Sequence, residues 1–172
     1  MGRRHIIGVM GGGTVSVGDL AAGYDLGRRI AKEGWVLLNG GRRAGIMDAS
    51  AKGAADRGGL TVGILPDDND AGVSEHIHIP VLTGMGSARN VINVLSSSVV
   101  VACAGGAGTL SEIALALKHG KTVITLNFDI GRAFDEYRKA GRLLAVESPE
   151  EAIERIRNVL DCADQCPDPQ KH

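Results

Sequence analysis

Short, continuous apolar runs alternate along this chain with longer stretches that have helical periodicity. Four of the runs, at residues 5–10, 35–39, 61–65 and 99–103, read as continuous rather than alternating apolar segments. Continuous runs of this kind are typical of parallel strands buried on both faces of a sheet. Because helical stretches separate them, we expect repeated strand–helix units with right-handed crossovers. The sequence therefore predicts a doubly wound, Rossmann-like α/β fold.

One domain accounts for nearly the whole chain, since 172 residues suffice for a single core. We place this domain at residues 1–162 and expect a disordered polar tail at 163–172. The predicted sheet is mostly parallel, with about seven strands flanked by helices. The expected strands are 5–10, 35–39, 61–65, 77–82, 99–103, 122–127 and 143–146. The expected helices are 19–33, 46–57, 88–95, 110–119, 132–139 and a last one that Ser148 caps.

Charge and composition exclude several classes of partner. The chain has 19 basic and 20 acidic residues, a net charge of −1, which gives no electrostatic footprint for nucleic acid or an anionic membrane. No apolar run approaches the roughly 18 residues of a membrane helix. Three cysteines without a paired framework indicate a reducing cytoplasm. We expect no protein-bound metal, because Cys162 and Cys166 have no second ligand pair nearby.

Glycine is the outlier in composition, with 25 residues, about double ordinary usage. Four glycine clusters, at residues 11–14, 40–45, 84–87 and 105–109, follow four predicted strands. The carboxyl ends of parallel strands share one edge of the sheet, where open α/β sheets bind ligands. Glycine permits close backbone approach, and helix amino termini offer unpaired N–H groups to anions. We therefore predict a site for phosphate or another anion at this edge.

The familiar nucleotide fingerprints do not fit these clusters. His119-Gly120-Lys121-Thr122 contains the core of a P-loop, but its first glycine is missing and a predicted strand follows. Gly106-Ala107-Gly108 lacks the third glycine of the dinucleotide fingerprint, because Ser111 stands there. The acidic residue expected near the end of the second strand is also absent, with Asn39 in that place. NAD is therefore not expected as a cofactor.

Three arginines on the same edge are candidate anion ligands. Arg42 and Arg43 lie within the second glycine cluster, and Arg89 opens the helix after the third. A cation beside a helix amino terminus is unfavourable for the helix, and a bound anion would remove the conflict. We interpret Arg43 as a loop residue that faces solvent and Arg89 as a residue that binds the ligand. For Arg42 both interpretations stay open.

Two interpretations of Glu112 stay open. Thr109 and Glu112 have the spacing of a capping box, which by itself explains both residue types. Residues 113–117 are apolar around the whole helix, which indicates burial on all sides and fits a subunit interface. A carboxylate at the start of such a helix contacts either the backbone or a ligand.

Residues 105–112, Gly-Gly-Ala-Gly-Thr-Leu-Ser-Glu, resemble the PGGxGTxxE signature of the Lonely Guy family, once described as lysine decarboxylases. The resemblance covers most of the chain and includes Gly40-Gly41 and Gly45-Ile46-Met47. It implies enzymes that hydrolyse nucleoside 5′-monophosphates to a cytokinin-type base and ribose 5-phosphate. In that family an arginine and the signature glutamate act on the glycosidic bond, and Arg89 and Glu112 match their positions.

A sister branch, the molybdenum cofactor carrier proteins, resembles the chain more closely. The matching segments are residues 6–11, 34–35, 84–90 and 112–118. The resemblance implies homo-oligomers that bind a phosphorylated pterin. The chain departs from the hydrolases at Ala104, where they have proline, and at Asn90, where they have lysine. Loss of the lysine puts hydrolysis in doubt but not phosphate binding.

We expect a cytoplasmic binding or carrier protein for a phosphorylated heterocycle, with the molybdenum cofactor or a nucleotide as cargo, that forms a homodimer or homotetramer. The alternative is a phosphoribohydrolase in which Arg89 and Glu112 are catalytic. A ligand-free scaffold leaves the glycine clusters unexplained, and no lysine is evidently placed for decarboxylase chemistry. The residues expected to hold the ligand are Gly11, Gly12, Gly13, Thr14, Gly41, Arg42, Arg89, Gly105, Gly106, Ala107, Gly108 and Thr109.

Overall fold

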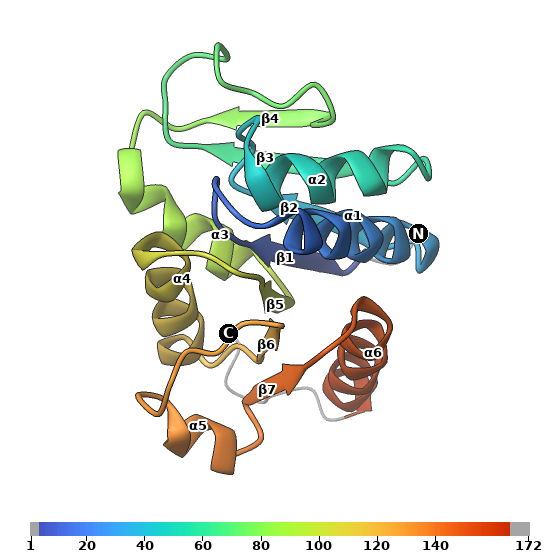
Figure 1. The fold of residues 1–172 in the computed structure, drawn as a ribbon, viewed down its shortest axis with the longest axis vertical. Coiled ribbons are helices and arrows are strands. Elements are labelled where there is room, and N and C mark those ends of the chain that lie inside the picture. Colours follow the sequence, from blue (N-terminus) through green and yellow to red (C-terminus); the bar gives the residue numbers. More distant parts are fainter. Residues whose placement is uncertain (1–3, 166–172) are drawn as a thin grey trace.

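Seven parallel strands form one sheet within residues 4–165, the part of the chain that this computed structural model describes (Figure 1). Their order is β4-β3-β2-β1-β5-β6-β7, and each neighbouring pair is parallel. The predicted doubly wound sheet is confirmed. The strands are β1 Ile6–Met10, β2 Val36–Asn39, β3 Thr61–Leu65, β4 Ile79–Leu82, β5 Val99–Ala102, β6 Val123–Leu126 and β7 Leu143–Val146.

The described residues form six α-helices, of which the first five lie between strands and the last follows β7: α1 Val17–Lys32, α2 Gly45–Ala55, α3 Asn90–Ser96, α4 Ala107–Lys118, α5 Asp135–Lys139 and α6 Pro149–Gln165. A short 3-10 helix, η1 Gly86–Arg89, leads into α3. Several boundaries differ from expectation by one to three residues, among them the start of α5, which lies at Asp135 rather than at 132. The helix expected from 110 begins three residues earlier, and α6 continues through 163–165, which we had expected to lie in the tail. Residues 166–172 lie outside the described part.

Two apolar cores lie on opposite faces of the sheet. On one face α1, α2 and α6 pack against side chains such as Ile7, Val99 and Ile124. On the other face α3 and α4 cover the alternate residues of the same strands, among them Met10 and Val100. Figure 1 shows this arrangement, with α3 and α4 on the side opposite α1, α2 and α6. Both faces of the central strands are therefore buried, which is why their sequences are continuously apolar.

The loops after β1, β2 and β5 are fixed to one another at the carboxyl edge of the sheet. Gly12 donates its N–H to Ala104 O at 2.8 Å, and Ile46 donates its N–H to Gly12 O at 3.0 Å. A Cβ on Gly11 would lie only 2.6 Å from the Ile46 side chain, so only glycine lets the β1 loop pass this close to α2. These contacts place three glycine clusters side by side.

The edge strand β4 differs from the central strands, because all four of its residues are exposed. It begins at Ile79, two residues later than expected, since Ile77 lies in the loop before it. None of the described helices is long and apolar enough to span a membrane. Among residues 4–165, no three His, Cys, Asp or Glu side chains gather closely enough to hold a metal ion.

Candidate ligand-binding site

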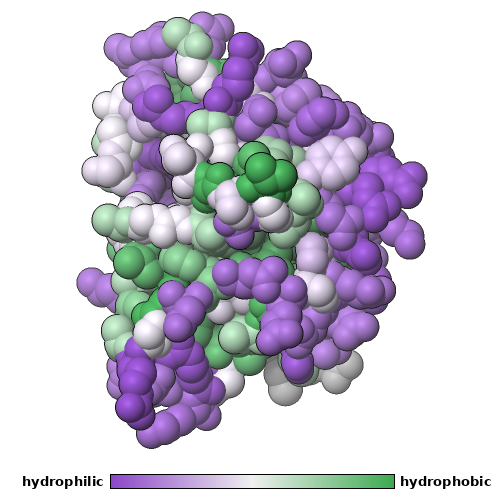
Figure 2. All heavy atoms as spheres, viewed as in Figure 1, coloured by the Kyte–Doolittle hydropathy of each residue, from purple (hydrophilic) through white to green (hydrophobic). Residues whose placement is uncertain are grey.

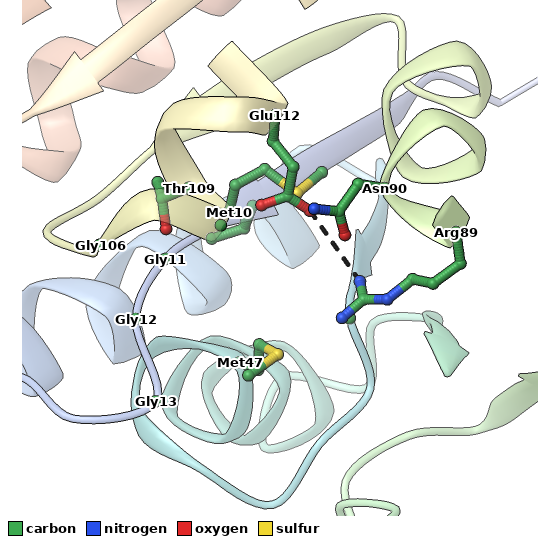
Figure 3. A pocket seen from close by; sticks show the side chains of 13 residues that line it. Met10, Gly11, Gly12, Gly13, Met47, Arg89, Asn90, Gly106, Thr109 and Glu112 are labelled. Atoms are coloured by element: carbon green, nitrogen blue, oxygen red, sulfur yellow. Dashed lines mark ion pairs between the residues drawn. The ribbon is translucent and has the colours of Figure 1, made fainter. Parts of the chain in front are cut away.

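A cavity of about 270 Å³ opens at the carboxyl ends of β1 and β5 (Figure 3). This is the point where the chain turns from building one half of the sheet to building the other, the usual ligand position in open α/β sheets. Its volume is slightly below the roughly 300–1,000 Å³ typical of small-molecule sites. The lining residues are Val9, Met10, Gly11, Gly12, Gly13, Gly40, Met47, Arg89, Asn90, Gly106, Gly108, Thr109 and Glu112.

Most of the residues expected at the site line this cavity: Gly11, Gly12, Gly13, Arg89, Gly106, Gly108, Thr109 and Glu112. Thr14, Gly41, Gly105 and Ala107 are chain neighbours of lining residues but do not line it themselves. Gly105 has a structural role, because a Cβ at this position would collide with the Thr109 side chain and lie 2.9 Å from Gly12 N. It therefore lets the first turn of α4 approach the β1 loop.

Arg42 is turned away from the cavity and pairs with Asp67 in the loop after β3. Its Nη2 lies 2.8 Å from Asp67 Oδ2, and 44% of its side chain is exposed. Arg43 is also exposed, as the solvated-loop interpretation predicts. The ion pair holds the β2 loop against the β3 loop, and Arg43 N–H adds a hydrogen bond to Gly72 O at 3.0 Å. Of the three arginines, Arg89 alone lines the cavity.

The amino terminus of α4 faces the cavity without a cap. Gly106 is the N-cap residue, and no side chain accepts a hydrogen bond from the first turn. Within the described residues, Leu110 N–H is the first in this helix to find an acceptor, Gly106 O at 3.1 Å. The preceding backbone N–H groups are left to solvent or a ligand, and they carry the positive end of the helix dipole. This is the geometry of an anion site.

The capping box predicted for Thr109 and Glu112 is wrong. Because α4 begins at Ala107, Thr109 is inside the first turn and cannot be the N-cap. Glu112 Oε1 instead accepts a hydrogen bond from Asn93 Nδ2 at 2.9 Å. The carboxylate therefore lines the cavity and does not cap the backbone of its own helix. Figure 3 shows it directed toward Arg89, which approaches from the opposite wall.

Arg89 is a buried guanidinium with unused hydrogen-bonding capacity. Only 12% of its side chain is exposed, yet in the described part of the chain it makes no hydrogen bond, and its buried Nε has no partner. Burial lowers the pKa of Arg89, and the neighbouring Glu112 carboxylate opposes that shift. The guanidinium rests against Gly40, where a Cβ would lie 2.6 Å from both terminal nitrogens. A guanidinium, which has only donors, is thus held at the cavity wall for an acceptor.

Burial also governs Glu112, whose side chain is 9% exposed. Loss of water raises the pKa of Glu112, while the Asn93 hydrogen bond and the charge of Arg89 act in the opposite direction. Arg89 Nη1 and Glu112 Oε1 are 3.9 Å apart, which is too far for a hydrogen bond. The two groups therefore attract one another without consuming each other's donors and acceptors.

Sequence reasoning missed Met10, Met47 and Asn93. Met10 ends β1 and Met47 lies in the first turn of α2, so both thioethers form apolar walls of the cavity. Asn93 is fully buried and holds Glu112 in place. The sequence feature that could have identified Asn93 is a single polar side chain within the apolar sequence Val91-Ile92-Asn93-Val94-Leu95 of α3. A polar residue on the buried face of a helix needs a partner, and the partner here is the glutamate.

The model of the SLOG cluster4 family matches residues 4–153, which is most of the chain. The chain belongs to the SLOG cluster4 family. A curated relative of this SLOG chain is the cytokinin riboside 5′-monophosphate phosphoribohydrolase of Rhodococcoides fascians, which is 32% identical over 131 residues, or 70% of this chain and 64% of that protein. The resemblance to the Lonely Guy superfamily is confirmed.

Solved structures related to this SLOG cluster4 chain include the molybdenum cofactor binding protein of Rippkaea orientalis. It is 49% identical with a TM-score of 0.87, over 92% of this chain and 98% of that one. The molybdenum cofactor carrier protein of Chlamydomonas reinhardtii is 40% identical with a TM-score of 0.86, over 92% and 99% of the two chains. The closer resemblance to the carrier branch is confirmed as well.

Proposed function

We propose that this protein binds and carries a phosphorylated heterocycle in the cavity between β1 and β5. Two features carry the proposal: Arg89, a buried guanidinium that makes no hydrogen bond within residues 4–165, and the uncapped amino terminus of α4. An unsatisfied buried polar group costs about 1–3 kcal/mol, and more when it is charged. A ligand with acceptor groups removes that cost when it binds.

The phosphate of the ligand lies at the first turn of α4 in this proposal. Gly106 and Gly108 have no side chain there, and a Cβ built on either meets nothing within 4 Å. The backbone N–H groups can therefore approach phosphate oxygens directly. The facing loop at Gly11, Gly12 and Gly13 closes the other side. The hydroxyl of Thr109 is directed toward this loop (Figure 3) and adds a donor.

The cofactor bound by the similar carrier proteins is the leading candidate for the cargo. The Rippkaea orientalis and Chlamydomonas reinhardtii proteins bind or carry the molybdenum cofactor, which joins an anionic phosphate to a flat heterocycle. The cavity offers matching parts, because an anion site lies beside the apolar walls of Met10 and Met47. We propose the molybdenum cofactor as cargo, with a nucleoside monophosphate as the alternative, and the cytoplasm as the place of action.

Hydrolysis of a nucleoside 5′-monophosphate is a second candidate, favoured by the placement of Glu112 opposite Arg89. An ionised carboxylate in a desolvated cavity would stabilise the positive charge that develops on the sugar as an N-glycosidic bond breaks. The Rhodococcoides fascians relative is named for this activity. Asn90, which stands where the hydrolases have lysine, instead donates a hydrogen bond to Ser111 Oγ at 3.1 Å.

Three measurements test the proposal: ligand detection, nucleotide hydrolysis and thermal stabilisation by ligands. Mass spectrometry of the natively purified protein should detect a phosphorylated pterin or nucleotide that survives purification. Incubation with AMP should release no adenine above background, as a carrier requires. Adenine release that Glu112→Ala abolishes would establish the hydrolase instead. A protein that retains no such ligand, and that neither phosphate nor nucleotides stabilise against heat, would contradict both functions.

A homo-oligomer is also part of the proposal. Exposed apolar side chains lie along α3 and α4, including Leu95 and Leu110, with the exposed Ala114 on the same helix as Leu110. Figure 2 shows the corresponding apolar surface over these helices. A contiguous apolar surface of this kind marks an interaction site in soluble proteins. The expected burial of α4 on all sides thus requires a second copy, because its outer face is exposed in the single chain.

A further inference from the structure

We propose that Arg89 and Glu112 bind the edge of the ligand's heterocyclic ring by hydrogen bonds. They select a 2-amino-4-oxo-pyrimidine edge, which guanine and pterins share. This inference rests on the proposed function, because it concerns the heterocycle of the same phosphorylated ligand. It assigns the two residues to base selection rather than to bond cleavage. The argument starts from the donors and acceptors that the protein itself leaves unused.

Glu112 presents one occupied and one unoccupied carboxylate oxygen. Oε1 accepts the Asn93 amide at 2.9 Å. Oε2 accepts no hydrogen bond from the described residues, although the side chain lines the cavity. An ionised carboxylate has acceptor sites for several N–H groups and can accept two parallel ones at once. Asn93 therefore fixes the orientation of the carboxylate and leaves its outer edge for donors on a ligand.

Arg89, which lies beside Glu112, offers hydrogen-bond donors where Glu112 offers acceptors. The guanidinium has only donors, and none of them is used within the described part of the chain. The separation of 3.9 Å from Nη1 to Glu112 Oε1 leaves both groups free to pair with neighbouring atoms of one planar ligand. The protein wall thus offers donors next to acceptors, and its complement is a ring edge with one acceptor next to donors.

A 2-amino-4-oxo-pyrimidine edge has this pattern. Its carbonyl oxygen accepts from Arg89, and its ring N–H and exocyclic amino group donate side by side to Glu112. Adenine places a ring nitrogen lone pair where the guanine edge has its N–H, so one donor is replaced by an acceptor that faces the carboxylate. Hypoxanthine keeps the carbonyl and the ring N–H but lacks the amino group. Guanine can therefore make the most hydrogen bonds with Arg89 and Glu112, hypoxanthine fewer, and adenine the fewest.

The walls of the cavity suit a flat ring in this position. Met10 and Met47 contribute polarizable thioethers to the lining, which adapt to aromatic surfaces. Gly40 keeps the Arg89 guanidinium in place, since any side chain there would displace it. The first turn of α4 lines the same cavity as Glu112, so one small ligand can meet both with its phosphate and its ring.

The test is isothermal titration of the full-length protein with GMP, IMP, AMP and inorganic phosphate, with chromatography after each run to confirm that the nucleotide is intact. We expect GMP to bind about 10- to 100-fold more tightly than AMP, as one bidentate contact allows, with IMP in between. Glu112→Gln should remove the preference for GMP over AMP while phosphate still binds. Glu136→Gln, on the exposed surface of α5, is the matched control and should keep the preference.

The outcomes separate the inference from the function on which it rests. Equal affinity for GMP and AMP, with phosphate binding intact, overturns base selection and leaves the phosphate site standing. A preference for GMP that persists in a folded Glu112→Gln protein also overturns it. If neither phosphate nor any nucleotide binds, the proposed function itself fails. Should Glu112→Gln not fold, the ranking of GMP and AMP by the native protein still decides.

Discussion

Burial controls the protonation of Glu112, and through it the charge of the cavity. Desolvation raises the pKa of this carboxyl above its ordinary value of 4.5, even with Arg89 nearby. The folded protein therefore holds the proton more tightly than the unfolded chain does. Its stabilising contribution is complete below the unfolded pKa and is lost as pH rises through the elevated pKa of the folded state. Ionisation of this carboxyl in the folded protein therefore costs free energy that a bound ligand can offset.

Glu112→Gln should accordingly stabilise the ligand-free protein at pH 7. Glutamine keeps the acceptor for Asn93 Nδ2 and removes the buried charge, so we expect the melting temperature to rise by about 2–4 °C per kcal/mol gained. At pH 4 the native carboxyl is protonated and the difference should shrink. Thermal unfolding of both proteins across this range checks the sign. A difference that grows toward low pH would contradict the account.

Gly40→Ala should weaken ligand binding while leaving the free energy of unfolding nearly unchanged. The new Cβ would lie 2.6 Å from both terminal nitrogens of Arg89, and a flexible side-chain end can move away at little cost. We expect a free energy of unfolding within about 1 kcal/mol of the native value, together with about tenfold weaker GMP binding. Gly72→Ala is the control, because its Cβ would meet only Arg42 at 3.8 Å. Unchanged affinity for GMP in Gly40→Ala would contradict this role of the glycine.

Arg89 and Glu112 could be singled out from the sequence because their positions match a signature and a helix terminus. Their partners could not. Asp67 lies in a loop 25 residues beyond Arg42, and no local pattern joins the two. Asn93 and Glu112 belong to different helices on one face of the sheet. Contacts of this kind depend on how α3 and α4 pack, which periodicity does not specify.

The start of α4 shows why the predicted elements were less accurate at their ends than at their centres. Its first turn is Ala107-Gly108-Thr109, and glycine and threonine are poor helix formers. The pattern therefore favoured a start at the apolar Leu110. The tertiary contacts of Gly105 and Gly12 hold this turn in place instead. The central strands β1, β2 and β5 were predicted to within one residue, because burial on both faces requires a continuous apolar sequence. The exposed edge strand β4 has no such requirement, and its start was predicted two residues too early.

Helices α1 and α2 depend on two glycines where their backbones meet. A Cβ on Gly27 would collide with Ser50 O, and one on Gly53 with Tyr24 O. Backbone atoms cannot step aside as a side-chain end can, so Gly27→Ala should destabilise the fold by about 1–3 kcal/mol or more. Urea denaturation measures this loss. Gly18→Ala in the same helix, with 3.7 Å to its nearest neighbour, should lose nothing, and equal losses in both variants would contradict this packing role.

The whole molecule exposes an apolar face on α3 and α4 that a second copy would cover. Leu110→Arg should therefore reduce the molar mass in solution, because a buried charge at an interface is costly. Val17→Arg is the control, since Val17 is 83% exposed on α1, on the opposite face of the sheet. Light scattering after size-exclusion chromatography reads out both masses and tells dimer from tetramer. A native protein that is already a monomer at micromolar concentration would contradict the proposed assembly.

The central claim is that the cavity at the β1–β5 edge binds a phosphorylated heterocycle through Arg89. Titration of GMP into native protein and Arg89→Met tests it most directly, because methionine fills similar space without donors. The ring carbonyl can accept up to two charge-assisted hydrogen bonds from Arg89, each worth about 1.5–3 kcal/mol, so their loss should weaken binding by about 100-fold. Circular dichroism should show the same fold in both proteins. Equal GMP affinity in native and Arg89→Met proteins would contradict the claim.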